Sequence, residues 1–237
     1  MSFGSMFIFS NLATSLDGKI APVDRDDFPL GTPEDREQMQ RLRRESDAIL
    51  FGASTLRAFK SFCHTRALAP GQVEPMNIVL SSKLEGISPK LPFFTDSGVK
   101  RVLFVSEGLS EKKLAPFRKS SEIQVLKKGT PKNPLILQLL NSLEKMGVKR
   151  LLVEGGGTVM ALFAEHDLID EYHVTLTPRI LGGAAAPTMV DGKGLPALKS
   201  LKLKLEQCRA VGDELYLVYR SRRASVEYRR ASVETYI

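Results

Sequence analysis

The sequence is short of the residues that build metal sites, disulfide frameworks and nucleic-acid stacking surfaces. Its 237 residues include no tryptophan, three histidines and two cysteines, Cys63 and Cys208. Two cysteines alone cannot make a zinc site and do not indicate a disulfide framework, so we expect no metal centre. Because disulfides are rare in reducing compartments, this use of cysteine favours a cytoplasmic protein.

Long hydrophobic runs are also absent. No apolar run approaches the roughly 18–20 residues that a membrane-spanning helix needs. The segment Met1 to Ile8 has neither the basic residues nor the long apolar core of a signal peptide. Because 43% of the residues are hydrophobic, the chain can still bury a substantial core. We therefore expect a globular protein without membrane contact, with one large α/β domain or two small ones.

Positive charge is in excess. The formal net charge is +7, and residues 221–237 hold four Arg and two Glu, which leaves five excess positive charges in residues 1–220. This excess suits a phosphorylated small molecule. A basic stripe with interleaved aromatic residues would indicate nucleic-acid binding, and the sequence has none. We therefore expect a phosphorylated small-molecule partner and no nucleic acid.

The tail of the chain is a near repeat. Residues 222–228 carry Arg-Arg-Ala-Ser-Val-Glu-Tyr, and residues 229–236 carry almost the same letters. Arg-Arg-Ala-Ser-Val resembles the substrate motif of cyclic-AMP-dependent protein kinase. We interpret the repeat as an artificial or read-through extension, with regulation by phosphorylation as the alternative. The predicted organisation is one domain over residues 1–220 and a separate tail over residues 221–237.

The most informative stretch lies between residues 147 and 164. Its pattern predicts a buried strand over Val148 to Val153, a turn of three glycines, and a helix over Thr158 to Ala164. Such a turn lets backbone approach a ligand, and the free N–H groups of the helix start bind anions. A turn without a ligand is the alternative. A carboxylate beside an anion site is unfavourable, so we expect Glu154 to contact a donor group on a second molecule.

The stretch matches neither common nucleotide-binding motif. A phosphate-binding P-loop needs Gly-Lys-Ser or Gly-Lys-Thr after its loop, and the chain has Gly157-Thr158-Val159 there. A Rossmann turn needs a last glycine where Met160 stands. A phosphate site here would therefore belong to another α/β fold.

The rest of the chain predicts a mixed, mainly parallel sheet with helices on both faces. Residues 201–210 and 214–219 flank a Val-Gly-Asp turn and predict a closing antiparallel hairpin. Ligands of such sheets bind beyond the carboxyl ends of the strands. Five predicted strands end in small or polar residues, which indicates a nucleotide cleft at that edge. These residues are Thr14-Ser15, Gly52 to Thr55, Ser81-Ser82, Ser106 and Glu154 to Thr158.

Five short motifs occur in order along the chain. They are Ser15-Leu16-Asp17-Gly18-Lys19-Ile20-Ala21, Leu42-Arg43 with Asp47-Ala48-Ile49-Leu50, Gly52-Ala53-Ser54-Thr55-Leu56, Val153-Glu154-Gly155-Gly156-Gly157-Thr158 and Pro178-Arg179-Ile180-Leu181-Gly182-Gly183. Together they resemble the RibD C-terminal family, the pyrimidine reductases of riboflavin biosynthesis. The resemblance covers roughly residues 6–220. It implies a dihydrofolate-reductase-like fold, NADPH as hydride donor and a homodimer.

The resemblance also implies roles for individual residues. Arg43 and Arg66 would bind the substrate phosphate, and Glu154, as the catalytic residue, would bind the pyrimidine or ribose. Without the resemblance, Arg43 would be interpreted as a solvated helix residue and Arg66 as a loop charge. The implied NADPH contacts are Ala13, Thr55, Ser82 at the adenosine end, and Gly155, Gly156, Gly157, Thr158 and Val159, continuing to Leu162, at the pyrophosphate.

The implied reaction is hydride delivery to C1′ of the ribose in its open imine form. No motif places a histidine to supply the proton. The chain lacks the H-x-E and P-C-x-x-C motifs of a zinc deaminase, so it would act as a stand-alone reductase.

Two departures from the family pattern leave the substrate open. The chain has Phe59-Lys60-Ser61 where the family usually has Asp-x-Pro, and Asp27-Phe28-Pro29 where it usually has Ser-x-Trp. One alternative is a related reductase of a pterin or of another small carbonyl compound. A second, non-enzymatic alternative is an NADP(H)-binding regulatory protein with a phosphorylatable tail.

Overall fold

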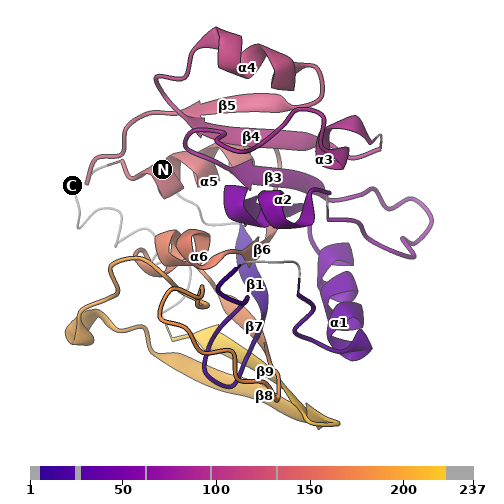
Figure 1. The fold of residues 1–237 in the computed structure, drawn as a ribbon, viewed down its shortest axis with the longest axis vertical. Coiled ribbons are helices and arrows are strands. Elements are labelled where there is room, and N and C mark those ends of the chain that lie inside the picture. The colour runs from indigo at the N-terminus through magenta and orange to yellow at the C-terminus, as the bar shows by residue number, and fades with distance from the viewer. Residues whose placement is uncertain (1–5, 25–27, 62, 97, 132, 223–237) are drawn as a thin grey trace.

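A single sheet organises the chain in our computed structural model, which describes residues 6–24, 28–61, 63–96, 98–131 and 133–222. In these residues nine strands follow the order β5-β4-β3-β2-β6-β1-β7-β9-β8 (Figure 1). The strands are β1 Phe7–Thr14, β2 Ala48–Gly52, β3 Met76–Leu80, β4 Arg101–Ser106, β5 Glu122–Leu126, β6 Arg150–Gly155, β7 Glu171–Leu176, β8 Leu203–Val211 and β9 Glu214–Ser221.

The sheet is mixed and mainly parallel, as the sequence predicts. Strands β1 to β7 pair in parallel, with β1 between β6 and β7. Strand β9 pairs antiparallel with β7, and β8 with β9, which confirms the closing hairpin. Because parallel strands point the same way, the ends of β1, β2, β6 and β7 share one edge of the sheet, called here the carboxyl edge.

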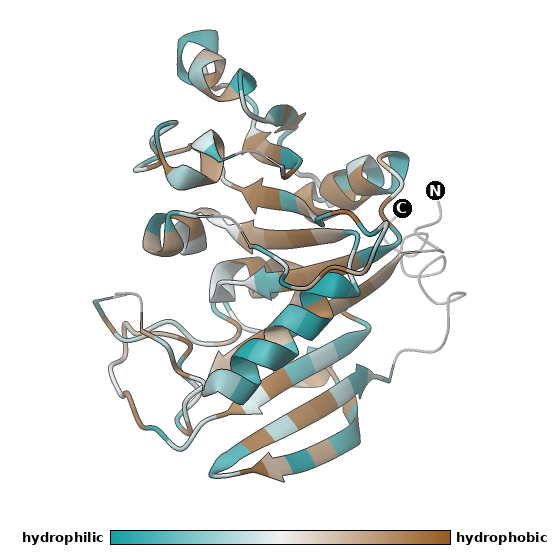
Figure 2. Cartoon of the chain, turned by 90° about the vertical axis from the view of Figure 1, so that its right-hand side faces the viewer, coloured by the Kyte–Doolittle hydropathy of each residue, from teal (hydrophilic) through white to brown (hydrophobic). Residues whose placement is uncertain are grey.

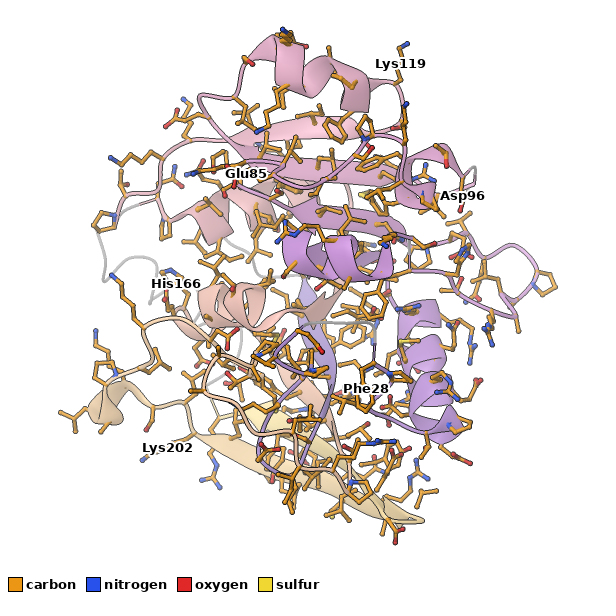
Figure 3. The ribbon with its side chains drawn as sticks, viewed as in Figure 1. Phe28, Glu85, Asp96, Lys119, His166 and Lys202 are labelled. Atoms are coloured by element: carbon orange, nitrogen blue, oxygen red, sulfur yellow. The ribbon has the colours of Figure 1, made fainter. Side chains whose placement is uncertain are left out.

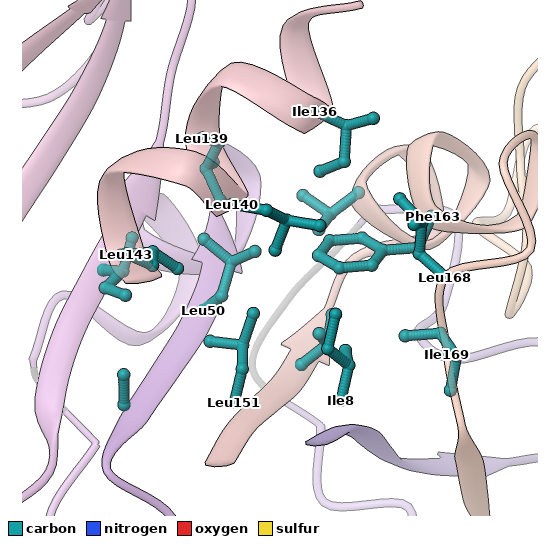
Figure 4. Close-up of a cluster of buried hydrophobic side chains, with 14 of the residues drawn as sticks. Ile8, Leu50, Ile136, Leu139, Leu140, Leu143, Leu151, Phe163, Leu168 and Ile169 are labelled. Atoms are coloured by element: carbon teal, nitrogen blue, oxygen red, sulfur yellow. The ribbon is translucent and has the colours of Figure 1, made fainter. Parts of the chain in front are cut away.

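Helices cover both faces. On one face α5 and α6 pack on a cluster that includes Ile8, Leu50, Leu151 and Phe163 (Figure 4). On the other face α1 to α4 cover a second cluster around Phe9, Phe51 and Phe93. The helices are α1 Pro33–Arg44, α2 Ala53–Phe59, α3 Pro92–Thr95, α4 Glu111–Arg118, α5 Leu135–Lys145 and α6 Gly157–Ala164, with a short 3-10 turn at Ala197–Lys199.

The sequence explains these layers. All five residues of β2 are buried, as expected of a strand covered on both faces. Helix α5 buries Ile136, Leu139, Leu140 and Leu143, which recur at helical spacing. Helix α1 is different, since it is mostly hydrophilic along its length and crosses the sheet as a teal ribbon in Figure 2. Its contact with the sheet is therefore largely polar.

The start of α1 is held by a contact with a distant strand. Thr32 precedes the helix and Pro33 is its first residue. The Thr32 hydroxyl does not cap the helix, because it donates to Glu214 Oε2 at 2.7 Å. The Thr32 amide donates to Glu214 Oε1 at 3.0 Å. Glu214 is buried on β9, so this side chain ties α1 to the hairpin.

The remaining differences are local. Helix α1 ends at Arg44, and α3 had no sequence signal. Among the described residues, no helix combines the length and apolar character that crossing a membrane requires. The repeated tail beyond Arg222 and the early-loop residue Asp27 lie outside the described residues.

Candidate active site at the carboxyl edge

Glu154 occupies an irregular position at the end of β6. Leu50 of β2 pairs with Val153, and the next residue, Phe51, pairs with Gly155. The register shift leaves Glu154 as an extra residue with no partner on β2. Such bulges bend a strand and re-aim a side chain. The Glu154 side chain faces α1, and its exposed fraction is 10%.

Arg43 of α1 meets this carboxylate with two parallel hydrogen bonds. Arg43 Nε donates to Glu154 Oε1 and Nη2 donates to Oε2, both at 2.6 Å. The Arg43 side chain is 11% exposed, so both charges are largely removed from water. Burial alone would lower the pKa of Arg43, but the charge of Glu154 raises it above its usual range. The pair is therefore a fixed, bidentate ion pair.

Residues that follow α2 make the remaining contacts of the Arg43–Glu154 ion pair. Cys63 Sγ donates to Glu154 Oε2 at 3.4 Å, and the His64 carbonyl accepts from Arg43 Nη1 at 3.1 Å. Burial and the charge of Glu154 raise the pKa of the Cys63 thiol, which favours its protonated form. Asn77 of β3 is fully buried and holds Cys63 by accepting from its amide at 2.7 Å.

The glycine turn follows Glu154 directly. Gly155 and Gly156 have φ values of 73° and 80°, a region that glycine adopts without strain. A Cβ on Gly156 would lie 3.4 Å from Thr55 Oγ1 and 3.5 Å from Ser54 Oγ. The turn after β6 and the start of α2 after β2 therefore come together, as the sequence predicts for the carboxyl edge.

Gly157 is enclosed by a turn from a distant part of the chain. A Cβ at this position would lie 2.4 Å from both Asp191 Oδ2 and the Thr188 carbonyl oxygen. The Asp191 amide donates to the Gly157 carbonyl at 3.0 Å, and its Oδ1 accepts from the Thr188 hydroxyl at 2.7 Å. No side chain larger than hydrogen fits there unless this turn moves.

These residues fit the pyrophosphate of a dinucleotide. Thr158 is exposed in the first turn of α6, where backbone N–H groups have no partner within the helix. The missing Cβ of Gly156 leaves room for close approach, and the hydroxyls of Ser54 and Thr55 lie beside it. Val159 is buried in the core, and its amide donates to the Gly156 carbonyl at 2.9 Å. The glycine turn is thus the part of the site that can hold a cofactor.

Two further motifs meet through Asp17. Its Oδ1 accepts from the Leu181 amide at 3.1 Å, and its Oδ2 accepts from the Gly182 amide at 2.7 Å. The Ser15 hydroxyl donates to Oδ1 at 2.6 Å. These bonds, with that of Ser15 the largest influence, lower the pKa of Asp17 to about 2. The loop after β1 is thereby joined to the loop after β7.

The two departures from the family pattern have different surroundings. Phe28, labelled in Figure 3, lies before α1 with its ring centroid 5.1 Å from Arg179 Cζ. Phe59 ends α2 with 59% of its surface exposed, and Lys60 follows with a φ of 61°. The Lys60 carbonyl accepts from the Phe93 amide at 3.1 Å. This left-handed turn leads the chain towards Cys63.

A half-buried carboxyl group on α1 had no signal in the sequence motifs. Asp35 lies in the first turn of α1, hydrogen-bonded to Thr175 of β7. Burial, together with the nearby charges of Glu214 and Glu154, raises the pKa of Asp35. Its Oδ1 is buried without a hydrogen-bond partner. The polar Glu34-Asp35 pair at a helix start is common enough that sequence alone gives it no function.

Other predicted residues lie around this centre. Ala13, half-buried, is near the end of β1 and pairs with Thr175. Ser82 is exposed just after β3. Arg66 is exposed, and its carbonyl and amide contact Arg44 and Gln40 of α1. The structure thus brings Arg43, Glu154, Thr55 and the glycine turn together, with Ala13, Ser82 and Arg66 at the periphery.

A separate groove lies on the other side of α1. It encloses about 530 Å³ between α1 and the β8–β9 hairpin and is lined by charged side chains such as Arg41, Arg44 and Arg209. None of the predicted site residues lines it. Among the described residues, no group of histidine, cysteine, aspartate and glutamate side chains could hold a metal ion.

Comparison with known proteins identifies relatives over nearly the whole chain. Residues 6–217 match the model of the RibD C-terminal domain. The 2,5-diamino-6-ribosylamino-4(3H)-pyrimidinone 5′-phosphate reductase of Methanothermobacter thermautotrophicus is 34% identical over 216 residues, which cover 90% of this chain and 97% of that protein. The enzyme of the same name from Archaeoglobus fulgidus is 30% identical, with coverages of 87% and 94%.

Solved structures confirm the fold class. Acinetobacter baumannii RibD, form 2, has a TM-score of 0.75 at 19% identity, and the match covers 92% of this chain and 58% of that longer chain. A dihydrofolate reductase from Enterococcus faecalis has a TM-score of 0.52 at 13% identity, covering 93% of this chain and 98% of that one. The predicted dihydrofolate-reductase-like architecture is therefore confirmed.

The contacts of Asp17 predict a pH-dependent contribution to stability. The pKa of Asp17 is lower in the folded chain than its ordinary value of 3.8, so its contribution is full above that value and is lost as the pH falls towards about 2. We expect Asp17→Asn to lower the Tm at pH 7 and the difference from the unsubstituted protein to shrink below pH 4. Thermal denaturation of both proteins across this range tests it, and a difference that is independent of pH would contradict it. Asp24→Asn, in the same loop, is the control.

Proposed function

The chain belongs to the RibD C-terminal domain family, and we propose that it is a nicotinamide-dependent oxidoreductase of riboflavin biosynthesis. Its substrate would be a 5-phosphoribosylamino pyrimidine, reduced to the ribitylamino form. The names of the relatives from Methanothermobacter thermautotrophicus and Archaeoglobus fulgidus favour the 2,5-diamino pyrimidinone as the ring. The observation that carries the proposal is that a fixed carboxylate, Glu154, is followed directly by a glycine turn at the end of one strand.

This succession suits a reaction between two bound molecules. Gly155, Gly156 and Gly157 with Thr158 would bind the pyrophosphate of NADPH through backbone N–H groups. Ala13 and Thr55 would lie along the nicotinamide half, and Ser82 along the adenosine half. Glu154 precedes the turn by one residue, so a substrate bound to it lies next to the cofactor. We propose NADPH and not NADH as the cofactor, because NADPH is the hydride donor that the family resemblance implies.

The chemistry requires a hydride and a proton. When bound, the cofactor supplies the hydride. A C–H bond forms at C1′ of the open ribose imine, the C1′–N double bond becomes a single bond, and its electron pair takes a proton at nitrogen. Glu154 would orient the substrate by accepting from ring N–H or ribose hydroxyl groups. The exposed Arg66 would bind the 5′-phosphate as a bidentate donor.

Asp35 is our candidate for the proton donor. Its carboxyl lies on α1 eight residues before Arg43, on the same side of the helix, and it experiences the charge of Glu154. The raised pKa of Asp35 keeps a larger fraction protonated near neutral pH than for an ordinary aspartate. An acid of this kind can donate a proton in the transition state. The three histidines are not needed for this role.

A second candidate function is reduction of a pterin or another small carbonyl compound. The motivating observations are Phe59, which stands where the family usually has Asp, and Pro29, which stands where it usually has Trp. We further propose that the protein is cytoplasmic and acts as a homodimer, in keeping with the family resemblance.

The first test of the proposed function is a turnover assay. NADPH oxidation would be followed by absorbance with freshly prepared 5-amino-6-(5-phosphoribosylamino)uracil, with its 2,5-diamino counterpart and with dihydrofolate. We expect turnover with one of the two ribosylamino pyrimidines, which also identifies the ring. Repeating the assay with NADH tests the cofactor preference. Turnover of dihydrofolate alone would refute the first function and support the second.

The role of Glu154 predicts a separation of cofactor and substrate effects. Glu154→Gln keeps the shape of the side chain and removes its charge. We expect NADPH affinity to stay nearly unchanged and turnover to be lost, because the residue contacts the substrate. Fluorescence titration with NADPH and steady-state kinetics measure the two quantities. Equal losses of both would contradict the assignment. Glu154→Ala is a poorer variant, since it leaves the buried Arg43 unpaired.

The role of Asp35 predicts a change in the pH profile. A donor must hold its proton, so kcat should fall as pH rises through the raised pKa of Asp35. Asp35→Asn should lower kcat by roughly 10²–10⁴-fold and remove that limb of the profile. Glu34→Gln, the exposed neighbour in the same helical turn, is the matched control and should keep it. A profile that is identical in Asp35→Asn and the unsubstituted protein would exclude Asp35 as the donor.

A further inference from the structure

We infer that Glu214 and Gly31 are positioning residues, which keep the carboxyl group of Asp35 free of the hydrogen bonds at the start of α1 so that it can carry a proton. This inference rests on the proposed function, in which Asp35 is the proton donor. Neither residue belongs to the motifs on which the family resemblance rests. The observations that carry it are the hydrogen bonds of Thr32, the space left by Gly31 and an oxygen of Asp35 that has no partner.

Asp35 stands where an acidic side chain can close the start of a helix. It is the third residue of α1, which begins at Pro33 directly after Thr32. A side-chain carboxylate at this position can accept from the amide of the residue before the helix, in the reciprocal arrangement called a capping box. An Asp35 used in this way would be ionised and hydrogen-bonded, and it would have no proton to donate.

Glu214 of β9 takes both donors of Thr32 instead. Its Oε1 accepts from the Thr32 amide at 3.0 Å, and its Oε2 accepts from the Thr32 hydroxyl at 2.7 Å. The Tyr216 hydroxyl is a third donor, to Oε2 at 2.7 Å. Three donors on a residue that is 2% exposed suit an ionised carboxylate, which only accepts. The start of α1 is therefore closed by a residue of the hairpin, and neither donor of Thr32 is left for Asp35.

Gly31 leaves the space in which the Asp35 side chain lies. A Cβ at position 31 would lie 2.2 Å from Asp35 Oδ2 and 2.4 Å from Asp35 Cγ. These separations are shorter than any van der Waals contact, so a side chain at position 31 would displace the carboxyl group. The carboxyl group of Asp35 is thus folded back against the backbone that precedes the helix.

The surroundings of Asp35 fit a protonated carboxyl group. Thr175 of β7 is its hydrogen-bond partner, and its Oδ1 is buried without one. An ionised oxygen buried without a donor is costly, whereas a protonated oxygen can donate to a bound substrate. Burial is the largest influence and, with the charges of Glu214 and Glu154, raises the pKa of Asp35. The hydrogen bond of Thr175 and the charge of Arg36 on α1 act against this rise.

Glu214 therefore acts on Asp35 in two ways. It occupies the donors that would otherwise hold Asp35 as an anion, and it adds a negative charge that disfavours the ionised form. Without the charge of Glu214, the Thr32 amide becomes available to Asp35. The unpaired N–H groups of the helix start then favour an ionised carboxylate at that position.

The kinetic test is the pH profile of kcat in Glu214→Gln, which keeps the shape of the side chain and removes its charge. The limb along which kcat falls as Asp35 loses its proton should move to lower pH by roughly one unit, the size of shift that a neighbouring charge produces. A limb at the same pH as in the unsubstituted protein would overturn the inference, even if kcat were lower throughout.

Glu171→Gln is the matched control for the loss of a carboxylate charge. Glu171 lies on β7 and contacts His173 and Arg220, and it is not among the charges that act on Asp35. This variant should leave the limb at its original pH. A shift equal to that of Glu214→Gln would show a general effect of lost charge and would overturn the inference.

Gly31→Ala tests the space for the carboxyl group. The added methyl group should push Asp35 aside and lower kcat by roughly 100-fold, the loss that misplacement by about 1 Å can cause. In Asp35→Asn, adding Gly31→Ala should cause no further loss, because the two residues act as a unit. Fully additive losses would show that position 31 acts on the helix as a whole, and they would overturn the role of Gly31.

A second measurement needs no turnover, so it separates this inference from the proposed function. Because the pKa of Asp35 is raised in the folded chain, its contribution to stability is full below the ordinary value of 3.8 and is lost as the pH rises through the raised pKa. The Tm of Asp35→Asn minus that of the unsubstituted protein should therefore increase with pH above 3.8. In the Glu214→Gln background the same difference should increase less, since one cause of the raised pKa is removed.

The outcomes of the two measurements are distinguishable. If the protein turns over neither ribosylamino pyrimidine but the Tm differences follow the expected order, the proposed substrate is wrong and the placement of Asp35 by Glu214 stands. If turnover is found and the Tm difference increases equally in both backgrounds, the proposed function stands and the inference is wrong.

Discussion

A buried pair of opposite charges connects two elements of this protein that lie far apart in the chain. Arg43 and Glu154 are 111 residues apart, and they join α1 to the end of β6 through two hydrogen bonds of 2.6 Å. Breaking such a pair by removing one partner typically costs about 3–5 kcal/mol, a large share of the roughly 5–15 kcal/mol that stabilises a domain. The mostly polar helix α1 is thus placed on the sheet by charge as much as by hydrophobic contact.

The Arg43–Glu154 pair and the glycine turn have different roles in the site. Glu154 is fixed by side chains, whereas Gly156 and Gly157 present backbone, and the Thr188–Asp191 turn encloses Gly157. Asp17 in turn joins the loops after β1 and β7. Each contact is made by a loop at the same edge of the sheet. The parallel strand directions, set by buried apolar strands such as β2, therefore determine which loops can meet.

Much of the fold could be predicted from the sequence, because strands such as β2 and β6 are short apolar runs bounded by turn residues. The glycine turn could also be predicted from the sequence, because it depends only on the local backbone of three consecutive glycines. The partners of Arg43 could not be predicted from the sequence. They depend on a register shift at Glu154 and on Cys63, which lies in a segment without periodicity. Asp35 was missed for a similar reason, because its raised pKa depends on burial in the folded chain and on the charge of Glu214, 179 residues away on β9.

The pairing of Arg43 with Glu154 also constrains how this sequence can change over generations. A substitution at either position alone would leave an unpaired charge inside the protein. Intermediate sequences that carry one of the two changes would therefore fold poorly and be removed by selection. Positions 43 and 154 should therefore be inherited together. Position 63 is less constrained, because a neutral thiol can be exchanged for another small donor in a single step. New substrate preferences at this site would then arise first through residue 63, with the two charges kept.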